Sequence, residues 1–128
     1  MSITIDVSPG ELVDKITILE IKLERIDDPA KLANIRYEQA ILLEILGRNI
    51  APSAEIDVLR GELKILNETI WRVEEELREF ERRKNFGAEF IEAARTVYFT
   101  NDRRADAKRR INELLGSRIL EEKSHKAY

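Results

Sequence analysis

Apolar residues recur at helical spacing along most of this chain, in four stretches separated by short polar segments. In the first stretch Leu12, Ile16, Leu19 and Leu23 follow the alternating three- and four-residue spacing of a packed helix. Helix start signals precede the stretches, such as Ser8 ahead of a proline. The pattern predicts helices over residues 8–26, 29–47, 54–85 and 88–116, followed by a polar tail over residues 117–128.

The third predicted helix has the most regular apolar pattern, and the chain then turns at Asn85-Phe86-Gly87 and returns as the fourth helix. The seam of the third helix consists of Ile56, Leu59, Leu63, Leu66, Ile70, Val73, Leu77 and Phe80. We therefore expect an all-α fold: an antiparallel helical bundle with a long coiled-coil helical hairpin, forming a single domain over residues 1–128. Whether the fourth helix is continuous or broken near Thr100 stays open at this point.

A different periodicity is found at the N-terminus, where Ile3, Ile5 and Val7 alternate with polar residues. Alternation of this kind is typical of a short, half-buried β-strand. A strand requires a partner, and two are open: residues 119–120 of the same chain, or residues 2–7 of a second copy.

Composition excludes several kinds of chemistry. The chain has no cysteine and one histidine, His125, so disulfides, thiolate metal sites and histidine-based catalytic triads are absent. No Gly-rich phosphate loop is present, and we expect no cofactor and no metal. Only five glycines and three prolines argue against a turn-rich β fold.

Charge and hydropathy bear on the partners and the location. The formal net charge of −3 and the aspartates interspersed among the basic residues 103–110 argue against nucleic-acid binding. No apolar run is long enough to span a membrane, and the N-terminal residues do not form a secretory signal. We therefore expect a cytoplasmic protein.

The feature that stands out is a polar interruption of the fourth helix. If its inward face continues from Phe90 through Val97, the next inward positions are Asn101, Arg104 or Ala105, and Lys108. Three interpretations are open: these residues set helix register through polar partners, they bind a small anion, or they are a solvated basic face. For the anion site the candidate ligand-binding residues are Asp14, Lys15, Asn101, Arg103, Arg104 and Lys108.

Two blocks of sequence carry a family resemblance. Residues 9–22, PGELVDKITILEIK, and the later TNDRR and INELLG resemble a family of short bacterial proteins catalogued as a domain of unknown function. The resemblance implies a bacterial source and a self-standing domain that spans nearly the whole chain. It implies no activity and no catalytic residue.

Two functions remain after these observations. The first is a non-enzymatic helical interaction or oligomerisation module, which we expect to form a homodimer or to bind a protein partner through its helical seams. The second is a small anionic-ligand binding protein, or a small helical isomerase- or lyase-like enzyme, that uses the polar residues between the first and last helices. An open pocket at those residues would favour the second function, and mutual pairing would favour the first.

Overall fold

The computed structural model describes all 128 residues and contains four helices and no strand. They are α1 (Pro9–Arg25), α2 (Pro29–Asn49), α3 (Ala54–Arg83) and α4 (Ala88–Leu114). The all-α prediction is confirmed. α4 is one continuous helix through Thr100, and α2 continues past Gly47 to Asn49.

Side-chain caps explain where the first three helices begin. The Ser8 hydroxyl accepts the Glu11 N–H at 3.2 Å, the Asp28 carboxylate accepts the Ala30 N–H at 2.9 Å, and Ser53 caps α3 in the same way. Each cap satisfies an N–H group that the first turn of a helix leaves unpaired. α3 ends where Lys84 adopts a left-handed conformation, with φ of 55°.

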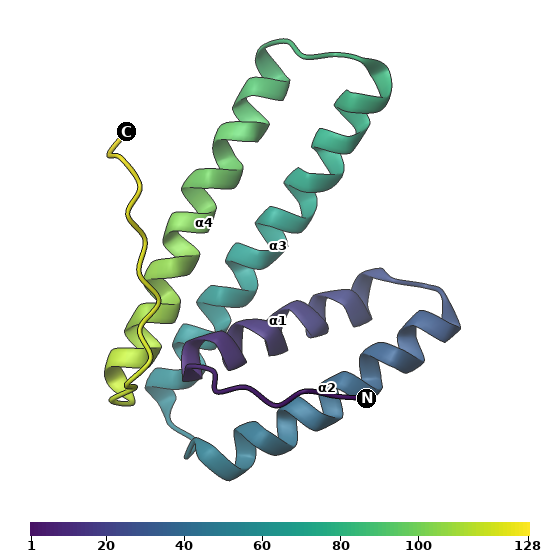
Figure 1. The fold of residues 1–128 in the computed structure, drawn as a ribbon. Coiled ribbons are helices and arrows are strands. Elements are labelled where there is room, and N and C mark those ends of the chain that lie inside the picture. Colours follow the sequence, from purple (N-terminus) through teal and green to yellow (C-terminus); the bar gives the residue numbers. More distant parts are fainter.

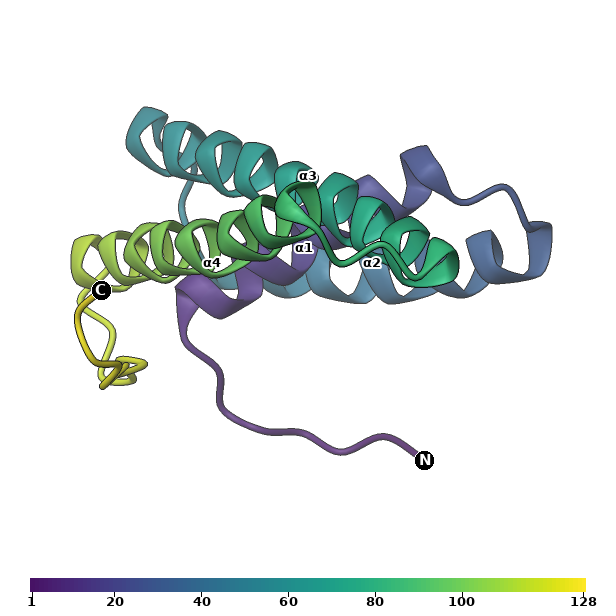
Figure 2. The same ribbon diagram turned by 90° about the horizontal axis from the view of Figure 1, so that it is seen from above.

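The two long helices, α3 and α4, lie side by side and antiparallel, and α1 crosses them near the end where α3 begins (Figure 1). α1 contacts each of the other three helices, whereas α2 contacts α1 only. Seen from above, α1 and α2 lie beneath the α3–α4 pair (Figure 2). The loop joining α3 to α4 lies at the end of that pair away from α1 and α2 (Figure 1). We call the part of the molecule where α1 crosses α3 and α4 the base, and the far end of α3 and α4 the tip.

The apolar core lies at the base. Val13, Ile16 and Ile21 of α1 are almost completely buried, because α1 has neighbours on several sides. One cluster of buried residues joins α1, α3 and α4: Val13, Ile56, Leu59, Leu63, Ala107 and Ile111. Burial of aliphatic side chains stabilises such a crossing by about 1.5–3 kcal/mol for each large residue.

The inward face of α4 is shifted by one position from the predicted one. Thr100 and Ala107 are the buried residues, with 4% and 0% exposure, whereas Asn101 and Lys108 lie at the edge of the interface. Small residues face the neighbouring helices because the backbones approach closely there. The polar side chains of the same turns reach around this contact to α1.

Neither end of the chain forms the predicted strand. Residues 1–7 form no strand; Ile3 and Ile5 are 79% and 71% exposed, and the segment leads away from the helices (Figure 2). Ile119 and Leu120 do not pair with it, because the C-terminal tail runs back along α4 (Figure 1). Tyr128 lies on Phe99 there, with ring centroids 4.6 Å apart. None of the four helices combines the length and the apolar character that crossing a bilayer requires.

Candidate functional site

A buried ion pair joins α1 to α4 at the base. Arg104 Nε donates to Asp14 Oδ1 at 3.0 Å, and Arg104 Nη2 donates to Asp14 Oδ2 at 2.6 Å. The Asp14 side chain is 1% exposed and that of Arg104 is 26% exposed. The planar guanidinium matches both carboxylate oxygens at once, which fixes the relative position of the two helices as well as balancing the charge.

α3 contributes an amide to the same cluster. Asn67 Nδ2 donates to Asp14 Oδ1 at 2.8 Å and to Thr17 Oγ1 at 3.0 Å. The Thr17 hydroxyl in turn donates to the backbone carbonyl of Asp14 at 2.7 Å. Asn67 is 6% exposed and Thr17 is fully buried. Three helices therefore meet at one carboxylate, and no buried side-chain nitrogen or oxygen lacks a partner.

The charges of this cluster are stabilised by their partners. Burial by itself would raise the pKa of Asp14, but hydrogen bonds from Arg104 and Asn67 outweigh it and hold the pKa below its ordinary value. The hydrogen bond to Asp14 raises the pKa of Arg104. Both groups stay ionised at neutral pH, so the pair is neutral as a unit.

Lys108 lies one turn further along α4 and is bound by two carboxylates. Its Nζ lies 2.9 Å from Glu11 Oε2 of α1 and 2.9 Å from Glu121 Oε2 of the tail. Burial lowers the pKa of Lys108, but the hydrogen bonds that its ammonium donates to Glu121 and Glu11 more than compensate and raise the pKa overall. The same contact with Lys108 lowers the pKa of Glu121. The C-terminal tail is thereby tied to the base.

The start of α1 lies directly against α4. The Gly10 N–H donates to Asn112 Oδ1 at 2.7 Å in a buried contact. A Cβ atom at Gly10 would lie 2.9 Å from that same oxygen and would collide with the backbone carbonyl of Lys108. Glycine is therefore required by the close approach of two helices.

The structure brings together four of the six predicted site residues: Asp14, Asn101, Arg104 and Lys108. Asn101 Oδ1 accepts a hydrogen bond from Arg104 Nη1 at 3.2 Å. Lys15 and Arg103 are exposed and make no hydrogen bond or ion pair with this cluster. Lys15 lies on the solvent side of α1, and Arg103 lines a separate shallow hollow with Glu62 and Asp106.

Sequence reasoning missed Asn67 and Glu11 as members of the cluster. Glu11 lies in the first turn of α1, outside the apolar seam, and Asn67 directly follows Leu66, through which the predicted seam of α3 runs. A signal for Asn67 does exist: it stands four residues after Leu63 and three before Ile70, which is also a helical seam spacing.

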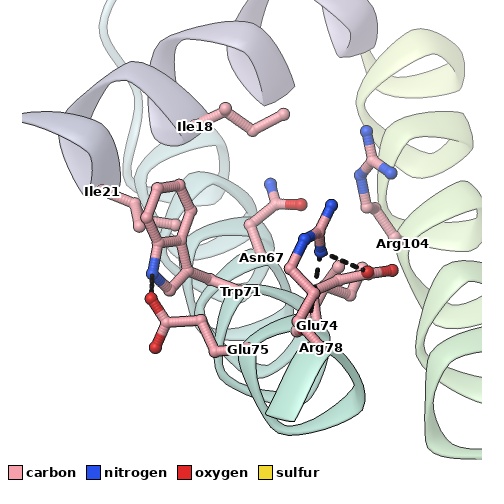
Figure 3. Close-up of a pocket in the computed structure, with 9 residues that line it drawn as sticks. Ile18, Ile21, Asn67, Trp71, Glu74, Glu75, Arg78 and Arg104 are labelled. Carbon is pink, nitrogen blue, oxygen red and sulfur yellow. Dashed lines mark hydrogen bonds and ion pairs between the residues drawn. The ribbon is translucent and has the colours of Figure 1, made fainter. Parts of the chain in front are cut away.

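An open groove borders the polar cluster. It has a volume of about 460 Å³, within the range of small-molecule sites. Ile18 and Ile21 of α1 lie on one side, with Trp71 and Asn67 of α3 opposite and Arg104 of α4 at one end (Figure 3). The walls are mainly apolar. Trp71 Nε1 donates to Glu75 Oε1 at 3.0 Å, which orients the indole.

No group of three or more His, Asp or Glu side chains is placed to hold a metal ion. The charged side chains of the polar cluster pair with one another: Arg104 pairs with Asp14, and Lys108 pairs with Glu11 and Glu121. The open side of the cluster is the end of the groove at Asn67 and Arg104.

Comparison with known proteins identifies a family for this chain. Residues 3–128 match the sequence model of a family of unknown function, DUF6165. The chain belongs to this family. The family resemblance noted from residues 9–22 and the later blocks is thereby confirmed. No curated protein and no solved structure matches the chain.

Proposed function

We propose that this member of the DUF6165 family is a non-enzymatic helical interaction module that forms a homodimer. The observation that carries the proposal is the exposed surface. A folded monomer of 14.9 kDa is expected to expose about 7,000 Å², whereas this chain exposes 9072 Å². The excess of about 2,000 Å² is more than the roughly 800 Å² that each partner of a standard interface buries.

The outer face of α2 is the best candidate for part of the interface. α2 has only one neighbouring helix, and Tyr37, Ile41 and Leu43 are 73%, 43% and 38% exposed. The N-terminal segment adds further exposed aliphatic residues, Ile3 and Ile5. Its alternating pattern supports pairing with the same segment of a second copy, where backbone hydrogen bonds absent from the single chain would form. The heptad seam of α3 supports coiled-coil packing in the α3–α4 hairpin.

Light scattering coupled to size-exclusion chromatography tests the proposal. We expect twice the mass of one chain at micromolar concentration, and a monomer under those conditions would overturn dimer formation. Ile41→Asp should shift the population toward monomer, because a carboxylate in an apolar interface loses hydration. Ile91→Asp is the matched control, since Ile91 is similarly exposed on α4, away from α2. Equal effects of the two variants would place the interface elsewhere.

The alternative function is a small anionic-ligand binding protein or an isomerase- or lyase-like enzyme. It needs an available cation at the base, and the ion pairs count against it: Arg104 is held by Asp14, and Lys108 by Glu11 and Glu121. A thermal-shift screen of anionic metabolites separates the two functions. Stabilisation by one compound that disappears in Lys108→Ala would favour ligand binding. The bacterial source and the cytoplasmic location remain predictions.

A further inference from the structure

The groove beside the base has an apolar body and one polar end, and the hydrogen-bonding capacity of that end is specific. The end is formed by Asn67 and Arg104, both held in place by Asp14. Because these contacts orient them, the atoms they leave unused define which chemical group can bind there.

Arg104 retains donors. A guanidinium has five N–H groups. In Arg104 three are engaged, two with Asp14 and one with Asn101. Two N–H groups therefore remain, and Arg104 is a lining residue of the groove. A hydrogen-bond acceptor on a ligand can be bound there.

Asn67 retains an acceptor. Its Nδ2 is used twice, by Asp14 and Thr17, while its Oδ1 accepts no hydrogen bond from the chain. Since no buried side-chain oxygen lacks a partner, this Oδ1 is open to the surface, and the groove is the cavity that Asn67 lines. Rotating the amide would set Oδ1 against the Asp14 carboxylate, so its orientation is determined. A hydrogen-bond donor on a ligand is needed opposite it.

The charges at the groove select against an anion. Arg104 is balanced by Asp14, and Arg78 Nη1 lies 3.0 Å from Glu74 Oε2. Glu75, the remaining ionised lining residue, accepts from Trp71 and has no cationic partner. A carboxylate ligand would face Asn67 Oδ1 with no proton to donate.

We propose that this groove binds a small neutral molecule with an apolar body and a terminal carboxamide. The carboxamide oxygen accepts from Arg104 and its NH₂ group donates to Asn67 Oδ1. The apolar body lies against Ile18, Ile70 and Trp71. This site is independent of the proposed dimer.

Trp71 is the one tryptophan of the chain and lies in the groove wall, so its fluorescence reports occupancy directly. Three probes of similar shape are titrated into the full chain: phenylacetamide, phenylacetate and phenethylammonium. We expect a saturable change with phenylacetamide and at least about tenfold weaker binding of phenylacetate, since an unmade hydrogen bond to a desolvated polar group costs about that factor. Equal or tighter binding of phenylacetate overturns the proposal.

Variants locate the site. Arg104→Lys keeps a cation beside Asp14 but removes the spare N–H pair, and we expect about a tenfold loss of phenylacetamide affinity. The matched control is Arg110→Lys, on the same helix but outside the groove, where Arg110 pairs with Glu62. It should leave the affinity unchanged. If Arg104→Lys does not fold, Ile18→Ala replaces it. This variant should weaken the binding of all three probes while preserving the ratios of their affinities.

Two further outcomes would contradict the site. Absence of any saturable change with phenylacetamide rejects it. A Trp71 signal that depends on protein concentration and not on phenylacetamide would mean that the groove is covered by a second copy. Light scattering is read on the same samples, so a failure of the dimer and a failure of the ligand site are distinguished.

Discussion

The base and the tip of the molecule are stabilised in different ways. At the base, Asp14, Thr17 and Asn67 are buried and hydrogen-bonded across three helices. Toward the tip, the charged side chains of α3 pair within one helix, as Arg72 does with Glu76 at 2.9 Å, and both remain exposed. Contacts across helices specify the arrangement of the fold, whereas contacts within one helix support that helix only.

The apolar contacts follow the same division. α1 makes the base a three-helix contact, and Ile16 and Leu63 have no exposed surface there. The tip has two helices only, joined by the edge-to-face contact of Phe80 with Phe90, with ring centroids 6.4 Å apart. Phe86 of the connecting loop packs edge-on against the same Phe90 ring. Phe86 is nevertheless 49% exposed. We infer that global stability depends on the base, and the following predictions test this difference.

The largest expected effect comes from removing Arg104. Arg104→Ala leaves the Asp14 carboxylate buried without a counter-charge, which costs about 3–5 kcal/mol in the free energy of unfolding. Arg72→Ala, near the middle of α3, removes an exposed ion pair and should cost about 0.5 kcal/mol or less. Denaturant unfolding followed by circular dichroism measures both. Similar losses for the two variants would contradict the distinction between the regions.

A pair of glycine substitutions tests how close the helices are. Gly10→Ala should destabilise the protein by about 1–3 kcal/mol, because its methyl group collides with α4. Gly61→Ala should stabilise it by about 0.5–1 kcal/mol, since Gly61 lies inside α3 with nothing within 4 Å of the added carbon. Thermal unfolding midpoints compare them. A stable Gly10→Ala variant would show that α1 and α4 can separate at no cost.

Low pH should destabilise the base of the molecule, the region where α1 crosses α3 and α4, through protonation of Asp14. The pKa of Asp14 is lower in the folded chain than its ordinary value of 3.8. The stabilisation is therefore complete above the unfolded pKa and is lost as pH falls through the folded pKa. The free energy of unfolding should decrease below about pH 4. Asp14→Asn should flatten this dependence, as measured by denaturant unfolding at several pH values; an unchanged slope would assign the acid sensitivity to other carboxylates.

The smallest expected effect is that of salt near the tip. A hydrogen bond from Arg82 lowers the pKa of the exposed Glu79 to about 2. Because this pair is in solvent, about 1 M salt should raise the pKa of Glu79 toward its ordinary value. The pKa of Asp14 should change much less, since its partners are buried. NMR titration of the carboxyl carbons at low and high salt follows both groups, and equal shifts would mean that Asp14 is accessible to ions.

Most of the fold follows from local signals in the chain. Ser8 ahead of a proline predicts the start of the first helix, and its hydroxyl accepts a backbone N–H there. Asp28 and Ser53 cap α2 and α3 in the same way. The residues of α4 that face the other helices could not be predicted from local signals. Asn101 was placed inward where Thr100 is buried, because the apolar pattern of α4 is weak and small residues occur on more than one face.

Some residues of the candidate site could also be predicted from local patterns in the sequence. Asp14, Arg104 and Lys108 were identified because charged residues near an apolar seam require partners. Which carboxylate each cation binds could not be deduced, since α1 carries several carboxylates in neighbouring turns. Asn67 was missed because one polar residue beside a regular seam has no distinctive local pattern.

The sequence by itself determined the helices, where they begin and the absence of thiol chemistry, because caps and spacing act over a few residues and the chain has no cysteine. Only the tertiary structure decided which side chains meet at Asp14, how closely α1 approaches α4, and that a groove opens beside Trp71. Those features depend on the rotation and crossing of whole helices. Rotating α4 about its axis by one residue would put Asn101 in the buried position that Thr100 occupies, and local signals do not distinguish the two arrangements.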